Sequence, residues 1–304
     1  MTALLKRMLA GFSRMALQST IFSNDAVIAF SRRLPQDRRL AMNTLELSQP
    51  PHQAQNQAQN QAQPKAQRLD GQRVVIIGGT SGIGLSAAIQ ARALGAHVVI
   101  VGRDAQTAQR LAHQHGFEGW RAGDVRSAAD IERALTDIPH VDHLVLLAGT
   151  FVAGKIREAD IGHLQGAFDE RIWAAVHAIR ALGDRLDKHG SVTLISGVLA
   201  DRPNAYGTAV LAAASAAMEA FARGLALELA PLRVNTLSPG PIDTPLLART
   251  LGAGRNAYVD ALTQQLPLHR LGTAEEAAAG VVFLMTNGFM NGATLHLDGG
   301  AALV

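Results

Sequence analysis

The sequence contains no cysteine among its 304 residues. A disulfide framework, a thiolate metal site and a cysteine nucleophile are therefore excluded. The eleven histidines are scattered without the HExxH spacing of a zinc helix, so no metal site is predicted. The sequence also lacks an uninterrupted apolar run of about 18 residues, the length that a membrane span needs. We expect a soluble, cytoplasmic protein that binds no metal and does not cross a membrane.

The positive charge of the chain is concentrated near its N-terminus. Residues 1–66 carry eight of the 28 Lys/Arg side chains but only three of the 25 Asp/Glu side chains. Residues 67–304 are consequently slightly acidic, with 20 basic and 22 acidic side chains. A nucleic-acid-binding protein needs a basic patch on its folded part. The overall charge of +3 therefore does not predict a nucleic-acid partner.

A short polar repeat, QAQNQAQNQAQ at 53–63, precedes the main part of the chain. Such a segment cannot bury enough apolar surface to fold. We therefore predict a disordered N-terminal extension and linker over residues 1–66 and one folded domain over residues 67–304. The basic, acid-poor start is compatible with an organellar transit peptide. The alternative, which we favour, is that translation begins at Met42.

From residue 67 onward, short β-branched runs alternate with Ala/Leu-rich segments of helical period. Near-continuous apolar strands separated by helices are typical of a parallel sheet that is covered on both faces. The sequence predicts a doubly wound α/β fold of the Rossmann type, with roughly seven parallel strands. Besides a strand before Asp124, the predicted strands are Arg73–Ile77, His97–Val101, His143–Leu147, Val192–Ile195, Val234–Leu237 and Thr294–Leu297, and the predicted helices include Ile83–Leu94, Ser127–Leu135 and Leu211–Leu229.

The first predicted strand leads directly into a glycine-rich turn, GGTSGIG at 78–84, and then into a helix. Glycines at such a turn let the backbone approach a pyrophosphate, whose charge the exposed N–H groups and the helix dipole receive. A purely structural turn is the alternative, but the strand before it and the helix after it favour cofactor binding. The cofactor contacts predicted in this turn are Gly78, Thr80, Ser81, Gly82, Ile83 and Gly84.

The spacing of these glycines resembles the TGxxxGIG turn of the classical short-chain dehydrogenase/reductase family. Further motifs similar to those of the family follow in order. DV at 124–125 resembles the pair that contacts adenine, LLAG at 146–149 stands where the family has NNAG, and RVNTLSPGPIDT at 233–244 resembles the segment that holds the nicotinamide. The resemblance extends over about residues 70–304, including the ending LDGG at 297–300. It implies cofactor contacts at Asp124, Val125, Ala148, Gly149, Pro239, Gly240, Ile242 and Thr244.

The choice of cofactor follows from the end of the second predicted strand. NAD-binding proteins usually place a carboxylate there to accept the ribose 2′-OH, whereas an arginine favours a 2′-phosphate. Gly102 occupies the acidic position and Arg103 follows it. A solvated surface arginine is the alternative interpretation. We predict NADP(H) as the cofactor.

The same resemblance reveals a gap in the catalytic residues. Reductases of the family use a Tyr-x-x-x-Lys pair, in which the tyrosine gives a proton to the substrate and the lysine lowers the tyrosine pKa. Alignment places Leu211 at the tyrosine position and Ser215 at the lysine position, and no lysine follows Lys188. Arg171 stands at the position of the family's asparagine. The chain therefore resembles a divergent branch of the family, for which the resemblance implies NADP(H) binding rather than a particular reaction.

Three side chains are candidates for the missing catalytic chemistry. Ser196 ends the fifth strand, where it could hydrogen-bond a substrate oxygen or merely cap a turn. Tyr206 could donate a proton, although a packed loop tyrosine is the simpler interpretation. Arg171 could stabilise a developing oxyanion, or it could pair with Glu170 or Asp169 at the surface.

The predicted partner is a small, apolar substrate. The segment Pro245–Leu266, which usually forms a loop shaping the substrate pocket in such folds, is mostly apolar. The resemblance also implies a homodimer or homotetramer. The favoured function is an NADP(H)-dependent oxidoreductase with a non-standard proton donor. The alternatives are an NADP(H)-binding pseudoenzyme or regulatory protein, and a structural subunit that needs no cofactor, which the intact cofactor motifs disfavour.

Overall fold

The computed structural model describes residues 68–304, so the predicted extension over residues 1–66 lies outside the described residues. Seven strands of the described part form one sheet in the order β3-β2-β1-β4-β5-β6-β9. All neighbouring strands in it are parallel, which confirms the predicted Rossmann-type fold. The strands are β1 Arg73–Ile77, β2 His97–Gly102, β3 Gly119–Ala122, β4 Val141–Leu146, β5 Leu186–Ile195, β6 Arg233–Pro239 and β9 Thr294–Leu297, and a small second sheet pairs β7 Ile242–Asp243 with β8 Gly272–Thr273.

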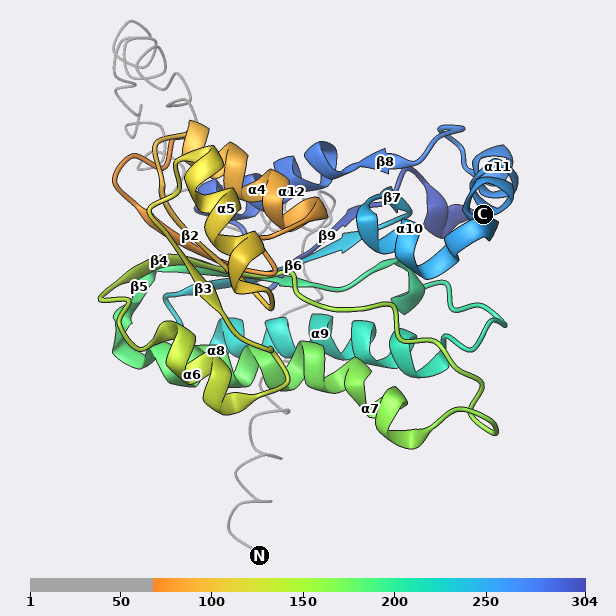
Figure 1. Cartoon of the computed structure of the whole chain (residues 1–304), viewed down its shortest axis with the longest axis horizontal. Coiled ribbons are helices and arrows are strands. Elements are labelled where there is room, and N and C mark those ends of the chain that lie inside the picture. The colour runs from red at the N-terminus through yellow and green to blue at the C-terminus, as the bar shows by residue number, and fades with distance from the viewer. Residues whose placement is uncertain (1–67) are drawn as a thin grey trace, which may run out of the picture. The chain divides into compact units, whose positions relative to one another are not determined.

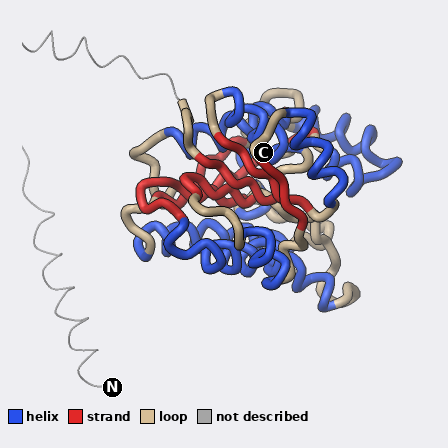
Figure 2. The backbone as a smooth tube through the Cα atoms, turned by 60° about the vertical axis from the view of Figure 1, so that its left-hand side comes forward, coloured by secondary structure: helices blue, strands red, loops and turns tan. Residues whose placement is uncertain are grey.

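Helices cover both faces of the large sheet, as Figure 1 shows, and Figure 2 shows the strands between two helical layers. Helices α4, α5 and α12 lie on one face, and α6, α8 and α9 lie on the other. Because β1 has β2 on one side and β4 on the other, the chain changes direction across the sheet beside β1. Such a switch point opens a crevice at the carboxyl ends of the strands. The helices are α4 Gly82–Ala93, α5 Ala105–His115, α6 Ala128–Leu135, α7 Ile161–Phe168, α8 Ala174–Leu182, α9 Ala209–Glu228, α10 Pro245–Leu251, α11 Arg255–Gln265 and α12 Ala274–Thr286.

The apolar strands are buried on both faces because two separate cores flank the sheet. In β1, Val75 and Ile77 belong to the core on the α6–α8–α9 side. Val74 and Ile76, which point the other way, belong to the core on the α4–α12 side. Successive residues of a strand alternate between faces, so a sheet with a core on each face requires an unbroken apolar run. This is the physical reason why the strands could be predicted.

The predicted and observed boundaries differ most at two places. Strand β5 begins at Leu186 rather than at Val192, and its first residues include the exposed, polar Lys188 and His189. A search for apolar runs misses such a polar strand start. The segment predicted as a loop over Pro245–Leu266 is instead largely helical, forming α10 and α11. Pro245 stands at the first position of α10, where its missing N–H costs no helical hydrogen bond.

Helix α9 is the one helix among the described residues that has the length and hydropathy of a membrane span. Of its most apolar window, 44% is buried inside the domain. Its buried side chains, among them Met218, Ala222 and Leu225, belong to the core beneath the sheet. Core packing therefore accounts for the apolar character of this helix.

Candidate active site

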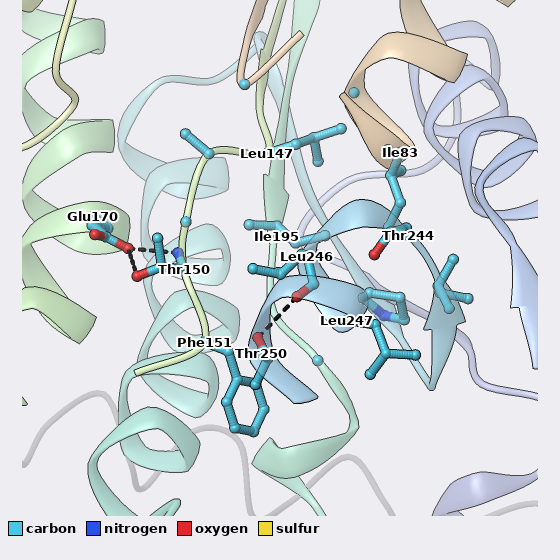
Figure 3. Close-up of a pocket in the computed structure, with 18 of the residues that line it drawn as sticks. Ile83, Leu147, Thr150, Phe151, Glu170, Ile195, Thr244, Leu246, Leu247 and Thr250 are labelled. Carbon is cyan, nitrogen blue, oxygen red and sulfur yellow. Dashed lines mark hydrogen bonds between the residues drawn. The ribbon is translucent and has the colours of Figure 1, made fainter. Parts of the chain in front are cut away.

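A cleft of about 730 Å³ opens at the carboxyl ends of the parallel strands. The turns that follow these strands form one wall, and α9 and α10 contribute the others (Figure 3). Ligands bind at this edge in open α/β sheets. All the cofactor and catalytic candidates predicted from the sequence line this single cleft.

The glycine-rich turn lies very close to the neighbouring backbone. A Cβ atom on Gly84 would lie 2.1 Å from the Gly78 carbonyl oxygen, and one on Gly78 would lie 2.6 Å from the Ala148 nitrogen. Gly78 also has a φ of +89°, which favours glycine. The N-terminus of α4 has neither a side-chain cap nor an acidic residue in its first turn. Its free N–H groups and its dipole therefore fit the pyrophosphate of a dinucleotide.

The end of β2 leaves little room for a side chain at position 102. A Cβ atom on Gly102 would lie 2.4 Å from Cγ2 and 2.8 Å from Oγ1 of Thr80. The glycine-rich turn, which carries Thr80, thus occupies the space that an acidic side chain at position 102 would need. Arg103 is exposed at the cleft, and no ion pair of Arg103 occurs within residues 68–304. Its guanidinium is free to bind an anion.

The predicted adenine pair is held in place by a local ion pair. The Asp124 carboxylate accepts hydrogen bonds from the backbone N–H of Arg126 at 2.9 Å and from its Nη2 at 2.9 Å. The hydrogen bond from the Arg126 side chain lowers the pKa of Asp124, while partial burial opposes this shift. Asp130 accepts a hydrogen bond from the Asp124 N–H at 3.1 Å. Asp124 is therefore an ionised, fixed acceptor, and Val125 beside it is buried.

Two of the family-like motifs, RVNTLSPGPIDT at 233–244 and LDGG at 297–300, contact each other. Gly240 donates its N–H to the Leu297 carbonyl at 3.0 Å. A Cβ atom on Gly240 would lie 2.6 Å from the Asp298 Cα, so only glycine fits there. The segment Pro239–Thr244 therefore passes directly beside the LDGG ending. Its position places Pro239, Ile242 and Thr244 along the cleft wall.

The positions of the expected tyrosine and lysine lie on the face of α9 that borders the cleft. Leu211 and Ser215 both line the cleft and are each 3% exposed. A leucine cannot donate a proton, and a serine carries no positive charge. The two residues aligned with the family's pair thus include one without a proton to give, Leu211, and one without a positive charge, Ser215.

Ser196 points toward α9 and does not cap a turn. Its Oγ lies 2.7 Å from Oε1 of Glu219 and 3.1 Å from the Ser215 carbonyl oxygen, and both can accept its proton. Glu219 was not among the residues predicted from the sequence. A signal was present, because Leu211, Ser215 and Glu219 recur at the four-residue spacing that places side chains on one helix face.

Tyr206 lies at the mouth of the cleft and is 80% exposed. Its backbone N–H donates to Oδ1 of Asn204 at 2.9 Å, which fixes the turn that carries it. The interpretation of Tyr206 as a packed loop tyrosine is therefore wrong. The loop before α9 projects its ring outward instead.

Arg171 lies in a single turn of π-helix, Asp169–Trp173, between α7 and α8. Its Nη1 and Nη2 donate to the carbonyl oxygens of Ala167 and Thr150, each at 3.3 Å. Burial lowers the pKa of Arg171, although the neighbouring Glu170 opposes this shift. The predicted alternative, a surface ion pair with Glu170 or Asp169, is wrong.

Glu170 is hydrogen-bonded to Thr150 instead, as Figure 3 shows. Its Oε2 accepts hydrogen bonds from the Thr150 N–H at 2.6 Å and from the Thr150 Oγ1 at 2.8 Å. This buried contact joins the π-helical turn to the loop after β4. It could not be predicted from the sequence, because no local pattern marks a π-helical turn or a partner that lies 20 residues away.

The remaining wall of the cleft is mostly apolar. Leu246 and Leu247 of α10 lie opposite Phe151 of the loop after β4 (Figure 3). Within α10, Thr250 donates its hydroxyl proton to the Leu246 carbonyl at 2.9 Å, so the hydroxyl is satisfied by the helix itself. This wall would contact an apolar part of a ligand.

A separate group of side chains lies at the opposite edge of the sheet, where β4 and β5 begin. His140, Asp142 and Asp187 could together offer three ligand atoms to a cation, although His140 is exposed. Asp142 already accepts a hydrogen bond from the Arg73 N–H at 2.7 Å. Exposed acidic clusters are common without any ion, and this one has a structural explanation.

Comparison with known proteins gives the family of this fold and site. Residues 78–302 match the family model described as Enoyl-(Acyl carrier protein) reductase. The short-chain dehydrogenase/reductase ucsE of Acremonium sp. is 31% identical over 78% of this chain and 97% of its own length. The chain belongs to the short-chain dehydrogenase/reductase family, whose members use nicotinamide cofactors.

Two solved structures are similar to the described domain. One is a small-chain dehydrogenase in complex with NADPH, 32% identical, with a TM-score of 0.67 over 77% of this chain and 100% of its own. The other is the L-sorbose reductase of Gluconobacter frateurii in complex with NADPH and L-sorbose. It is 27% identical, with a TM-score of 0.71 over 77% of this chain and 98% of its own.

Proposed function

We propose that the protein is an NADP(H)-dependent oxidoreductase acting on a small, largely apolar molecule. The observation that carries the choice of cofactor is the end of β2. Position 102 is a glycine packed against the Thr80 side chain and carries no carboxylate, and Arg103 beside it has no ion pair within residues 68–304. A carboxylate there would repel a 2′-phosphate, whereas an arginine binds one through charge-assisted hydrogen bonds. Similarity to two structures that contain NADPH supports the same choice.

Different segments of the cleft would bind different parts of the cofactor. The N-terminus of α4 and the glycine-rich turn would hold the pyrophosphate, Asp124 the adenine, and the segment Pro239–Thr244 the nicotinamide. When bound there, NADPH supplies a hydride, and the protein contributes orientation, exclusion of water and a proton.

We further propose that Ser196 supplies the proton to the substrate, with Glu219 behind it as the exchanging group. Ser196 lies at the carboxyl end of β5 and within the cleft, and its hydroxyl is hydrogen-bonded to Glu219 at 2.7 Å. For this step Glu219 must carry a proton: Ser196 would give its hydroxyl proton to the substrate oxygen, Glu219 would pass its own proton to Ser196 Oγ, and solvent would reprotonate the Glu219 carboxylate. This pair would replace the Tyr-Lys pair, whose positions Leu211 and Ser215 occupy.

Replacement of Ser196 by alanine tests this assignment. On a substrate found by screening carbonyl, imine and enone compounds for NADPH oxidation, we expect Ser196→Ala to lower kcat by about 10²- to 10⁴-fold. Tyr206 is exposed at the cleft mouth, so Tyr206→Phe serves as the matched control that also removes a hydroxyl. This variant should keep kcat within about twofold of the wild-type value. The opposite pattern would assign the proton to Tyr206. Full activity of both variants would refute both assignments.

We also propose that the chain forms a homodimer or homotetramer. Members of the family are typically oligomeric, and the first turns of the outer face of α9 here expose the small residues Ala213, Ala216 and Ala220. Leu227 at the end of this face is 84% exposed. Small side chains let two helices approach closely. Sedimentation equilibrium should therefore give at least twice the chain mass, and Ala216→Glu should shift the protein toward the monomer, whereas a monomeric wild type would contradict the proposal.

The second candidate function is an NADP(H)-binding protein without turnover. The apolar Leu211 at the tyrosine position is the observation that favours it. Saturable NADPH binding together with no NADPH oxidation by any compound of the screen would support this function over catalysis.

A further inference from the structure

We infer that Arg171 is an anion-binding group of the substrate site. The ligand it selects is an amphipathic acid, with an apolar body and a carboxylate or an equivalent oxyanion. This inference names the substrate class of the oxidoreductase proposed above, and so rests on that function for the reaction, but its binding test does not depend on turnover.

The hydrogen bonding of Arg171 is incomplete. A guanidinium has five N–H donors. Two long hydrogen bonds, each of 3.3 Å, reach the backbone carbonyls of Ala167 and Thr150. Its Nε is buried and has no partner among the described residues. Because the Nε–H is enclosed by protein, the donors left for a ligand are the second N–H groups of Nη1 and Nη2.

Glu170 partly offsets the cost of burying the Arg171 charge, but it does so without a direct ion pair among the described residues. Within residues 68–304, Arg171 forms no ion pair with any carboxylate. Its neighbour Glu170 is turned to Thr150, whose N–H and hydroxyl both donate to the same carboxylate oxygen. A guanidinium in a partly buried site is costly unless an anion offsets the lost hydration. A substrate anion would remove that cost.

The fold holds the guanidinium in position before any ligand arrives. The π-helical turn carries both Glu170 and Arg171, and both engage Thr150, one at its N–H and hydroxyl and the other at its carbonyl. The guanidinium also lies against Gly149. A Cβ atom at that position would come within 3.5 Å of Cζ and Nη2, which is ordinary contact distance. The loop after β4 and the π-helical turn thus act as one rigid support.

The surroundings of Arg171 define the rest of the ligand. The cleft beyond it is lined by Phe151, Leu199, Leu246 and Leu247. The fork of a guanidinium matches the two oxygens of a carboxylate, which gives a bidentate contact. The phosphates of the cofactor already have their own donors at the glycine-rich turn and at Arg103. The anion left for Arg171 therefore belongs to the substrate, and an apolar body would fill the leucine-rich wall.

A matched pair of probes tests the inference without knowledge of the substrate. Calorimetric titrations of the full chain, with and without NADP⁺, would compare 2-naphthoate with its neutral isostere 2-naphthamide. We expect wild-type protein to bind the carboxylate about 10- to 100-fold more tightly than the amide. Arg171→Gln should abolish this preference while leaving the amide affinity unchanged, and Arg171→Lys should retain part of it.

The control is Arg249→Gln, because Arg249 is an exposed arginine of α10 that lines the same cleft. This variant should keep the preference for the carboxylate. Equal binding of the two probes to wild-type protein, or no binding of naphthoate, would overturn the inference even if the Arg171 variants fail to fold. Loss of the preference in Arg249→Gln but not in Arg171→Gln would also overturn it.

NADPH titration of the same samples separates this inference from the proposed function. Probe discrimination without NADPH binding would leave the anion site standing and refute the cofactor. NADPH binding without probe discrimination would refute the anion site alone.

Discussion

Gly84→Ala should lower the affinity for NADPH by more than about 100-fold. The added Cβ would lie 2.1 Å from the Gly78 carbonyl oxygen, far inside contact distance. The atom it meets belongs to the backbone, so no side-chain rotation can relieve the clash. The turn that approaches the pyrophosphate would have to open, and overpacking of this kind also costs about 1–3 kcal/mol of stability. Fluorescence titration with NADPH and thermal unfolding would measure both effects.

The matched control is Gly224→Ala in α9. Gly224 also lies in a helix, but a Cβ there would meet no atom within 4 Å. Alanine should stabilise that helix by up to about 1 kcal/mol and leave NADPH affinity unchanged. If Gly84→Ala bound NADPH within threefold of the wild type, the glycine-rich turn would not be the pyrophosphate site.

Arg103→Ala should weaken NADPH binding by about 10- to 100-fold, since it removes a charge-assisted contact to the 2′-phosphate. NADH has no 2′-phosphate, and its affinity should stay nearly constant. Equal loss for both cofactors would contradict the role of Arg103.

A substitution at the neighbouring Gly102 provides a second test of the preference for NADPH over NADH. Gly102→Asp introduces the carboxylate of an NAD site, yet its Cβ would lie 2.4 Å from Thr80 Cγ2. We therefore expect this variant to lose affinity for both cofactors instead of gaining NADH. A clean switch to NADH would show that Thr80 can move aside, and that sterics do not set the cofactor choice.

Sequence patterns predicted the parts of the fold that local chemistry determines. The strand β1 was predicted with both boundaries correct, because all four of its apolar residues enter one of two cores. The glycine-rich turn was predicted from its glycines. The structure requires them, because a Cβ atom on Gly84 would clash with the Gly78 backbone and one on Gly78 would clash with the Ala148 backbone. Such requirements act over a few residues and therefore leave a readable pattern.

The parts that were missed depend on contacts between distant segments. Glu170 meets Thr150 across 20 residues of sequence, and Ser196 meets Glu219 across 23. The environment of Arg171 depends on a π-helical turn, which has no periodicity of its own to read. Candidate site residues could thus be predicted from the sequence, but the hydrogen-bond partners that decide their chemistry could be identified only from the structure.

The central claim is that the cleft is an NADP(H) site, and direct titration of the wild-type protein tests it. Purified full chain would be titrated in parallel with NADPH and with NADH at one ionic strength. We predict saturable binding of NADPH at micromolar concentration, with at least about tenfold preference over NADH. Absence of saturable binding of either cofactor would contradict it, and the glycine-rich turn would then be a structural feature alone.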